Sequence, residues 1–110
     1  MSRRSPNLLL HCVFCAVRSD ADPGELRFVM AELEALRAVV EGMLDFRHGP
    51  NRDYEAKSEG HPYGFVIAFR DRAAHMSYDG HPRHKAAGAR LVALCEGGAD
   101  GIVVYDIEAE

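Results

Sequence analysis

The segment from Tyr78 to His84 places a tyrosine and two histidines around a predicted helix break. Gly80 is typical of the position just after a helix end, and Pro82 is typical of the first turn of the next helix. His81 would then be the N-cap, and His84 would lie in the first turn. The exposed N–H groups there disfavour a nearby positive charge, which keeps a histidine neutral. A neutral His84 could act as a general base, while Tyr78 orients it or donates to a developing oxyanion.

The same residues allow two other interpretations. His84 could be a packed structural residue with one ring nitrogen hydrogen-bonded, which is the commoner situation for so short a motif. His81 and His84 could instead hold a metal ion, but a cap residue points away from the first turn, and the sequence places no carboxylate as a third ligand. We therefore expect neither a metal nor an organic cofactor. No role is predicted for His48, His61 or His75.

The composition is that of a compact domain with a net negative charge. The chain has 110 residues, is 47% hydrophobic and has a formal net charge of −4. This length is enough for a hydrophobic core, and no apolar run reaches the ~18 residues of a membrane span. A basic face, which nucleic-acid binding requires, is not expected. We predict one domain over residues 8–110 after a disordered tail of residues 1–7, with neither a nucleic-acid nor a membrane partner.

Cys12 and Cys15 have the C-x-x-C spacing of redox and zinc sites. They lie in a strand-like apolar run, where side chains three apart point to opposite faces, so the two thiols cannot converge. A second C-x-x-C is absent, and no helix opens after Cys12 as in a thioredoxin-like site. Three reduced thiols, including Cys95, indicate a reducing compartment. The run after Arg3 and Arg4 is interrupted and lacks a cleavage site, so we expect a cytoplasmic protein rather than export.

Hydrophobic periodicity predicts the order β-α-β-β-α-β, with the second helical region broken in its middle. Strands are expected over residues 8–18, 43–48, 62–70 and 101–107. Helices are expected over residues 23–41, 72–78 and 82–96. This is the ferredoxin-like α+β arrangement, an antiparallel sheet with helices on one face.

The first and third strands are apolar on both faces. A sheet of this kind needs cover on both sides, but the predicted helices can cover only one. We therefore expect a homodimer in which a second copy covers the other face, with a buried area of roughly 1,200–2,000 Å² or more. That face would carry Cys12, Phe14, Val66 and Ala68.

The complete pattern resembles the stress-responsive α/β-barrel family, often called Dabb, over about residues 9–107. The likeness rests on His11, Met43-Leu44-Asp45-Phe46, Gly49-Pro50-Asn51, Gly64-Phe65-Val66-Ile67-Ala68-Phe69, the segment from Ser77 to His84, and Val103-Val104-Tyr105-Asp106. The resemblance implies a homodimer whose two sheets join into a barrel with the helices outside. It implies no particular reaction, because most of the family has none assigned.

One branch of this family, the plant polyketide cyclases that form olivetolic acid, uses a His–Tyr pair without metal or organic cofactor. By the motif, the resemblance gives the catalytic roles to His84 and Tyr78 and a pocket position to His11. Two pocket positions differ from that branch. Leu33 stands where the branch has a tyrosine, and Tyr63 where it has a histidine, so the same substrate is not expected.

We therefore expect a homodimeric stress-responsive domain that binds a small apolar or aromatic molecule between sheet and helices, or that simply associates with other proteins. The pocket would be lined by His11, Leu33, Tyr63 and Phe65. The alternative is a cofactor-independent cyclase, lyase or isomerase that uses His84 and Tyr78 on a small carbonyl compound. A pocket of a few hundred Å³ at these two residues would favour a ligand site, and a filled one a structural role.

Overall fold

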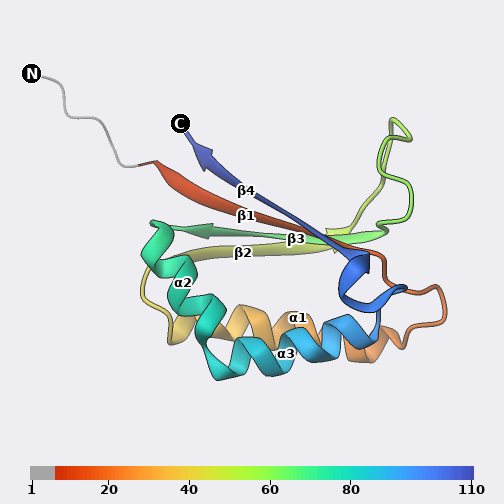
Figure 1. The fold of residues 1–110 in the computed structure, drawn as a ribbon, viewed down its shortest axis with the longest axis horizontal. Coiled ribbons are helices and arrows are strands. Elements are labelled where there is room, and N and C mark those ends of the chain that lie inside the picture. Colours follow the sequence, from red (N-terminus) through yellow and green to blue (C-terminus); the bar gives the residue numbers. More distant parts are fainter. Residues whose placement is uncertain (1–6) are drawn as a thin grey trace, which may run out of the picture.

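The computed structural model describes residues 7–110 and confirms the ferredoxin-like α+β fold (Figure 1). Its strands are β1 (Leu8–Cys15), β2 (Met43–Pro50), β3 (Tyr63–Phe69) and β4 (Ile102–Ala109). Its helices are α1 (Pro23–Ala35), α2 (Arg72–Gly80) and α3 (Pro82–Ala93), with short 3₁₀ turns η1 (Leu36–Ala38) and η2 (Gly98–Gly101). Of the predicted N-terminal tail, all but Asn7 lies outside the described residues.

The strands form one antiparallel sheet in the order β2-β3-β1-β4. The helices lie along one side of this sheet, and the other side carries no helix (Figure 1). Strand β1 is central, so His11 pairs with Ile67 of β3 on one side and with Asp106 of β4 on the other. Directly paired residues point to the same face of a sheet. The register therefore brings His11 and Asp106 together on the helix side.

The core lies between the sheet and the helices. Alternate residues of β1 and β3 enter it, while the apolar stripes of α1 and α3 close it from the other side. Its members include Val13, Cys15, Phe65, Ile67, Phe69, Val29, Met30, Leu33, Ala87 and Leu91. At about 25 cal/mol per Å² of apolar surface removed from water, this burial is the main force that holds the layers together.

Helix α1 ends earlier than the periodicity predicted. It stops at Ala35 and continues only as the turn η1, whereas we expected a helix through residue 41. Val39 and Val40 are β-branched and have low helix propensity. Gly42 then turns the chain with a φ of +87°, where a Cβ would lie 2.8 Å from that of Ala74. A glycine is required here by both the backbone conformation and the close approach.

The other differences are smaller. β1 stops at Cys15 because the chain then leaves the sheet, with Ala16 bonded to the carbonyl of Gly101 and Arg18 to that of Leu94. β4 continues to Ala109 because all of it pairs with β1. The turn η2 was not predicted.

The break between α2 and α3 is where the sequence placed it. His81 has an extended backbone, and its Nδ1 accepts a hydrogen bond from the backbone N–H of Arg83 at 3.1 Å. Pro82 occupies the first helical position, which confirms His81 as the N-cap. The chain changes direction at this cap, and Tyr78 and His84 meet across it.

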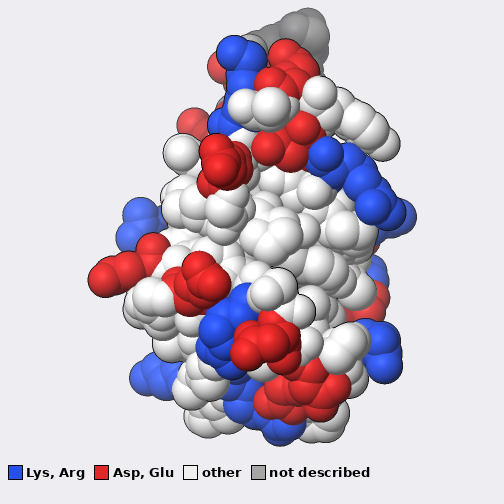
Figure 2. Space-filling model, turned by 90° about the vertical axis from the view of Figure 1, so that its right-hand side faces the viewer, with Lys and Arg blue, Asp and Glu red and all other residues white. Residues whose placement is uncertain are grey.

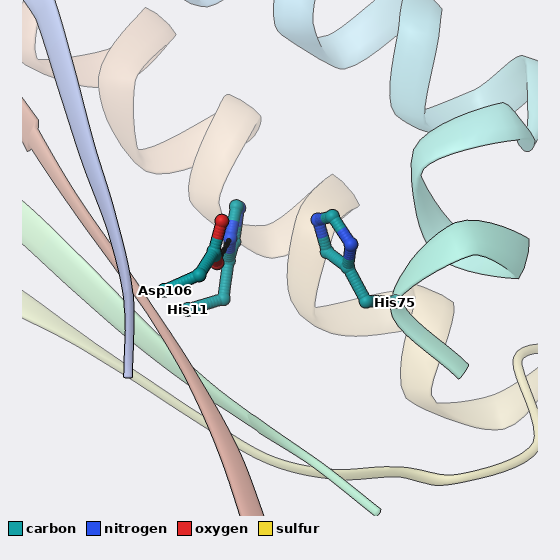
Figure 3. A group of neighbouring side chains, drawn as sticks. All are labelled: His11, His75 and Asp106. Atoms are coloured by element: carbon teal, nitrogen blue, oxygen red, sulfur yellow. Dashed lines mark hydrogen bonds and ion pairs between the residues drawn. The ribbon is translucent and has the colours of Figure 1, made fainter. Parts of the chain in front are cut away.

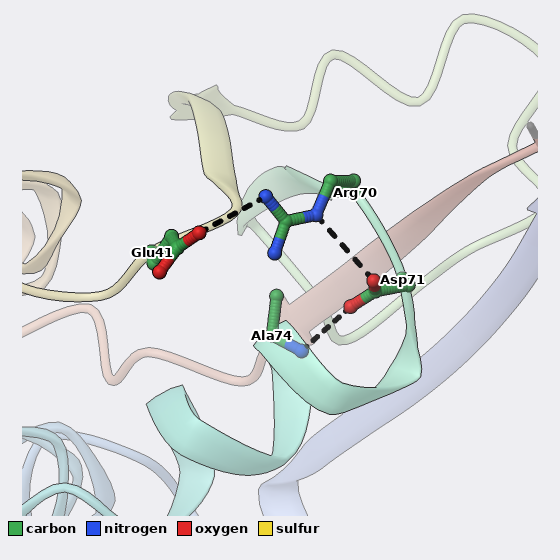
Figure 4. A network of polar contacts seen from close by, with 4 residues as sticks. All are labelled: Glu41, Arg70, Asp71 and Ala74. Carbon is green, nitrogen blue, oxygen red and sulfur yellow. Dashed lines mark hydrogen bonds and ion pairs between the residues drawn. The ribbon is translucent and has the colours of Figure 1, made fainter.

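A polar network fixes the start of α2 (Figure 4). Asp71 caps the helix, because its Oδ1 accepts the backbone N–H of Ala74 at 2.9 Å. Arg70 lies between Asp71, with Nε 3.4 Å from Oδ2, and Glu41, with Nη1 3.5 Å from Oε1. The Ala74 N–H, aided by Arg70, holds the pKa of Asp71 below its usual range. The network joins the turn after α1, the end of β3 and the start of α2, the helix that carries His75 and Tyr78.

The sheet face opposite the helices is apolar and open. Phe14 is half-buried there, and Tyr105 and Ile107 of β4 are 58% and 51% exposed. Val66 and Ala68 share this face, as predicted. Cys12 also lies here, whereas Cys15 is fully buried on the helix side, so the expectation that the two cysteines point apart is confirmed.

The charged side chains of the surface are mixed in sign. Figure 2 looks at the end of the molecule where the loop of residues 51–62 lies, and it shows acidic and basic groups intermingled around a largely uncharged surface. Within residues 7–110, no helix has the length and apolar character needed to cross a membrane.

Candidate functional site

Four polar aromatic side chains gather between the sheet and the helices, three of them around Phe69 and the fourth against Tyr78. His11 comes from β1, His75 and Tyr78 from α2, and His84 from α3. His75 and Tyr78 are three residues apart and therefore project from the same side of α2. The ring centroids are 4.4 Å apart for Tyr78 and His84, 4.8 Å for His11 and His75, and 6.0 Å for His11 and Tyr78. The predicted residues His11, Tyr78 and His84 thus lie in one cluster.

His84 has a defined tautomer. Its Nδ1 is 3.0 Å from the backbone oxygen of Asp79, and a carbonyl can only accept, so Nδ1–H donates. Nε2 of the neutral ring is therefore a hydrogen-bond acceptor. Burial lowers the pKa of His84, with smaller effects in the same direction from His11 and His75, against the opposing influence of Asp79. The direction agrees with the sequence-based expectation of a neutral imidazole.

Tyr78 is enclosed, with only 1% of its surface exposed. Burial raises the pKa of its phenol far above the ordinary value, and the charge of Asp79 adds to the effect. The hydroxyl therefore stays protonated and can serve only as a neutral donor or acceptor. Its ring packs against that of His84 at an angle of 51°, and within the described residues no direct hydrogen bond joins them.

His11 is paired with an acid that the sequence did not indicate. Its Nδ1 lies 2.6 Å from Oδ1 of Asp106, a short hydrogen bond of the charge-assisted kind. His11 is 9% exposed, whereas Asp106 lies on the edge strand and reaches solvent. Opposite this pair stands His75 (Figure 3). Burial lowers the pKa of His75, and the neighbouring His11 lowers it further.

Neither Asp106 nor His75 was assigned a role from the sequence. Asp106 meets His11 through the pairing of β1 with β4, which is a long-range contact. His75 carried a weaker local signal, because it precedes Tyr78 by three residues and must share its side of the helix.

The remaining predicted pocket residues come from α1 and β3. Leu33 is buried on α1, and Phe65 stacks on Phe46 with centroids 5.5 Å apart. Tyr63 is at the opposite end of β3 from Phe69, roughly 20 Å away at the rise of a strand. Its hydroxyl is bonded to Nδ1 of His48. This places Tyr63 away from His84, and the role of all three residues in binding stays a prediction.

Two open hollows lie on the other face of the sheet. One of about 420 Å³ lies between the sheet and the 51–62 loop and is lined by Phe14, Val103 and Tyr105 among others. A second, of about 280 Å³, is lined by Phe14, Gly64 and Val66. Both lie on the face that a second copy is expected to cover. Neither hollow is lined by Tyr78 or His84, so neither is the pocket at this pair that would favour a ligand site. At the cluster itself Tyr78 is enclosed, whereas His75 and His84 remain partly accessible.

Comparison with known proteins gives one family and a consistent fold. The model of the family described as Stress Responsive A/B Barrel Domain (Dabb) matches residues 9–109. A dimeric ferredoxin-like protein of unknown function from Jannaschia sp. CCS1 is 45% identical, covers 93% of this chain and 99% of its own, and superimposes with a TM-score of 0.87. No curated protein matches the sequence.

Two more distant structures show the fold alone. The hydroxynitrile lyase from Passiflora edulis is 17% identical over 96% of this chain and 95% of its own, with a TM-score of 0.79. A Dabb family protein from Mesorhizobium loti is 20% identical over 92% of this chain and 95% of its own, with a TM-score of 0.69.

Proposed function

The chain belongs to the stress-responsive α/β-barrel (Dabb) family, and we propose that it is a homodimer that binds a small aromatic or apolar molecule at the cluster of His11, His75, Tyr78 and His84. The dimer is supported by the open apolar face and by the 45% identical relative, which is described as dimeric. The free thiols support a cytoplasmic setting.

The observation that carries the binding site is the convergence of His84 and Tyr78 at 4.4 Å beside His11. Binding sites for small molecules are mostly apolar, with a few placed polar groups that set orientation. Phe69 and the ring of Tyr78, both buried, pack directly behind these polar groups as the apolar part. Nε2 of His84 supplies an acceptor for a hydroxyl or carboxylic acid of the ligand. A small aromatic ring with one such group is the best match.

Thermal-shift measurements with small aromatic acids and phenols test this site. A ligand that binds only the folded state stabilises it by about 2.7 kcal/mol at a concentration of 100 times its Kd. We expect at least one compound to raise the Tm of the wild type and of a control, His61→Ala, in the 51–62 loop. His84→Ala should lose that shift. An equal shift in all three proteins would place the ligand elsewhere.

A second candidate is acid–base catalysis on a small carbonyl compound. The tautomer of His84 favours it, because the bond from Nδ1–H to Asp79 leaves Nε2 as a base, and Tyr78 stays protonated as a donor. In a reaction found with a ligand from the screen, His84→Ala should abolish turnover. Tyr78→Phe should reduce it less, since such groups contribute roughly 10²–10⁴-fold each. Unchanged turnover in His84→Ala would contradict the catalytic role and leave ligand binding as the only proposed function.

A further inference from the structure

Three side chains of ligand type converge on the helix side of the sheet, and we propose that His11, His75 and Asp106 bind a divalent transition-metal ion of the zinc class. Each residue offers one ligand atom, and these atoms all lie within 4.8 Å of one another. Figure 3 shows His11 and Asp106 side by side on the strands, with His75 reaching toward them from α2. This site goes beyond the proposed small-molecule function and does not depend on it.

The fold holds two of the three ligands in fixed relation. His11 and Asp106 are directly opposed in the β1–β4 ladder and are joined by a hydrogen bond, with 2.6 Å between Nδ1 and Oδ1. A metal ion can take the place of such a bridging hydrogen, with the ring proton on the other nitrogen of the imidazole.

The third ligand is available and aimed at the pair. The rings of His75 and His11 lie 4.8 Å apart, centre to centre. Among residues 7–110 the ring of His75 takes part in no hydrogen bond, although it is half-buried.

The separation fits a site that closes on its ion. Ligands at about 2.0–2.2 Å from a tetrahedral zinc lie roughly 3.3–3.6 Å from one another. The widest spacing of 4.8 Å must therefore shorten by roughly 1.2–1.5 Å, and His11 and Asp106, now 2.6 Å apart, must separate by about 1 Å. The side chain of Asp106 is 42% exposed and can make this movement, whereas His11 is nearly buried. The exposed carboxylate also provides an entry path from solvent.

The donor set selects the class of ion. Two imidazoles with one carboxylate suit zinc, cobalt, nickel and iron(II), whereas magnesium and calcium prefer sites made of oxygen alone. Three protein ligands leave at least one position for water or another small ligand. The nearby charges come from α2, with Asp79 favouring a cation and Arg72 opposing it.

Cobalt titration of the full chain, freed of metal by a chelator, tests the site. We expect one Co²⁺ per chain, with visible absorption of a low-coordinate site and no intense near-ultraviolet band from cysteine thiolates. Zinc should displace the cobalt. His75→Ala and Asp106→Asn should each weaken binding at least ~10-fold, the usual scale for loss of a ligand or its partner. Both sit at partly exposed positions, so circular dichroism can establish that the variants are folded.

Two controls separate this site from its alternatives. His61→Ala should bind cobalt like the wild type. His84→Ala should also keep cobalt while losing the small-molecule shift, so failure of one proposal is distinguishable from failure of the other. Stoichiometric binding that survives both His75→Ala and Asp106→Asn overturns the assignment. Absence of binding by the wild type at concentrations up to about 1 mM overturns it as well, because protein sites with three such ligands bind far more tightly.

Discussion

His84 and Tyr78 have complementary protonation states that come from one physical cause. Both are removed from water, and removal disfavours the charged form of each. The imidazole therefore remains a neutral acceptor at Nε2, and the phenol remains a neutral donor. A ligand or substrate at this pair meets one acceptor and one donor over a wide range of pH.

The free energy of unfolding should decrease as the pH falls below the pKa of an unperturbed histidine. The pKa values of His75 and His84 are lowered in the folded state, whereas the unfolded chain takes up these protons near pH ~6.5. Below that pH the unfolded state binds more protons, so the free energy of unfolding decreases until the folded-state pKa is passed. Thermal melts between about pH 7 and about pH 5 measure the effect. His84→Gln should show a smaller loss than the wild type, with His61→Gln as the control.

NMR titration of the six histidines provides the direct check. The signal of His84 should titrate at lower pH than that of an ordinary exposed histidine. A value above ~6.5, or an unchanged pH dependence in His84→Gln, would contradict the prediction.

Cys15 should be inert toward alkylating reagents in the native protein. Burial, aided by the nearby Cys95 thiol, raises the pKa of Cys15 to about 12. The thiolate is the reactive form, and at pH 8 only about one Cys15 side chain in ten thousand is then ionised. Peptide mapping after iodoacetamide treatment should find Cys15 modified only when denaturant is present. Rapid modification of the folded chain would show that this strand opens.

At the scale of the elements, the short connection between α1 and β2 depends on Gly42. Its φ of +87° is strained for other residues, and an added Cβ would meet Ala74 at 2.8 Å. Gly42→Ala should lower the free energy of unfolding by roughly 1–3 kcal/mol. Because Ala74 belongs to the first turn of α2, the change should also disturb the signals of His75 and Tyr78.

Gly88 offers the matched control. It lies inside α3 with nothing within 4 Å of an added Cβ and with no positive φ. Gly88→Ala should therefore stabilise the helix by about 0.5–1 kcal/mol. Urea unfolding of the two variants compares them, and equal effects would mean that backbone conformation does not decide the cost at Gly42.

The elements also show which features the sequence could predict. Capping signals are local, so the helix starts were predicted correctly, and the structure shows the capping residues to be Asp22, Asp71 and His81. The end of α1 was placed too late, because the apolar spacing continues to Val40 while the backbone turns. Asp106 escaped prediction because it joins the cluster only through pairing of strands that are 95 residues apart at this contact. Tyr63 was expected at the same site, but its distance along β3 appears only once the register is known.

At the scale of the whole molecule, the open sheet face should be the dimer interface. The ring of Phe14 closely approaches Gly64 of β3, where an added Cβ would lie 3.0 Å from it, and its centroid is 6.3 Å from that of Tyr105. Phe14→Arg would bury a charge there and should yield a monomer or an aggregate. Val39→Arg is the control, because Val39 is an apolar, 53% exposed residue that follows η1, away from this face. Light scattering at micromolar concentration distinguishes the outcomes, and a well-folded wild-type monomer would contradict the proposal.

The same open face links the stability of the proposed dimer to its abundance. When folding and association are coupled, each tenfold dilution costs about 1.4 kcal/mol of association free energy per dimer. The unfolding midpoint should then rise with protein concentration, which a monomer's would not. In a cell that makes little of this protein, the chain would be monomeric and its face with Tyr105 and Ile107 would be exposed to water. In a cell that makes much of it, the chain would be dimeric and more stable. Raising expression would thus increase both the amount of the protein and the resistance of every copy to heat.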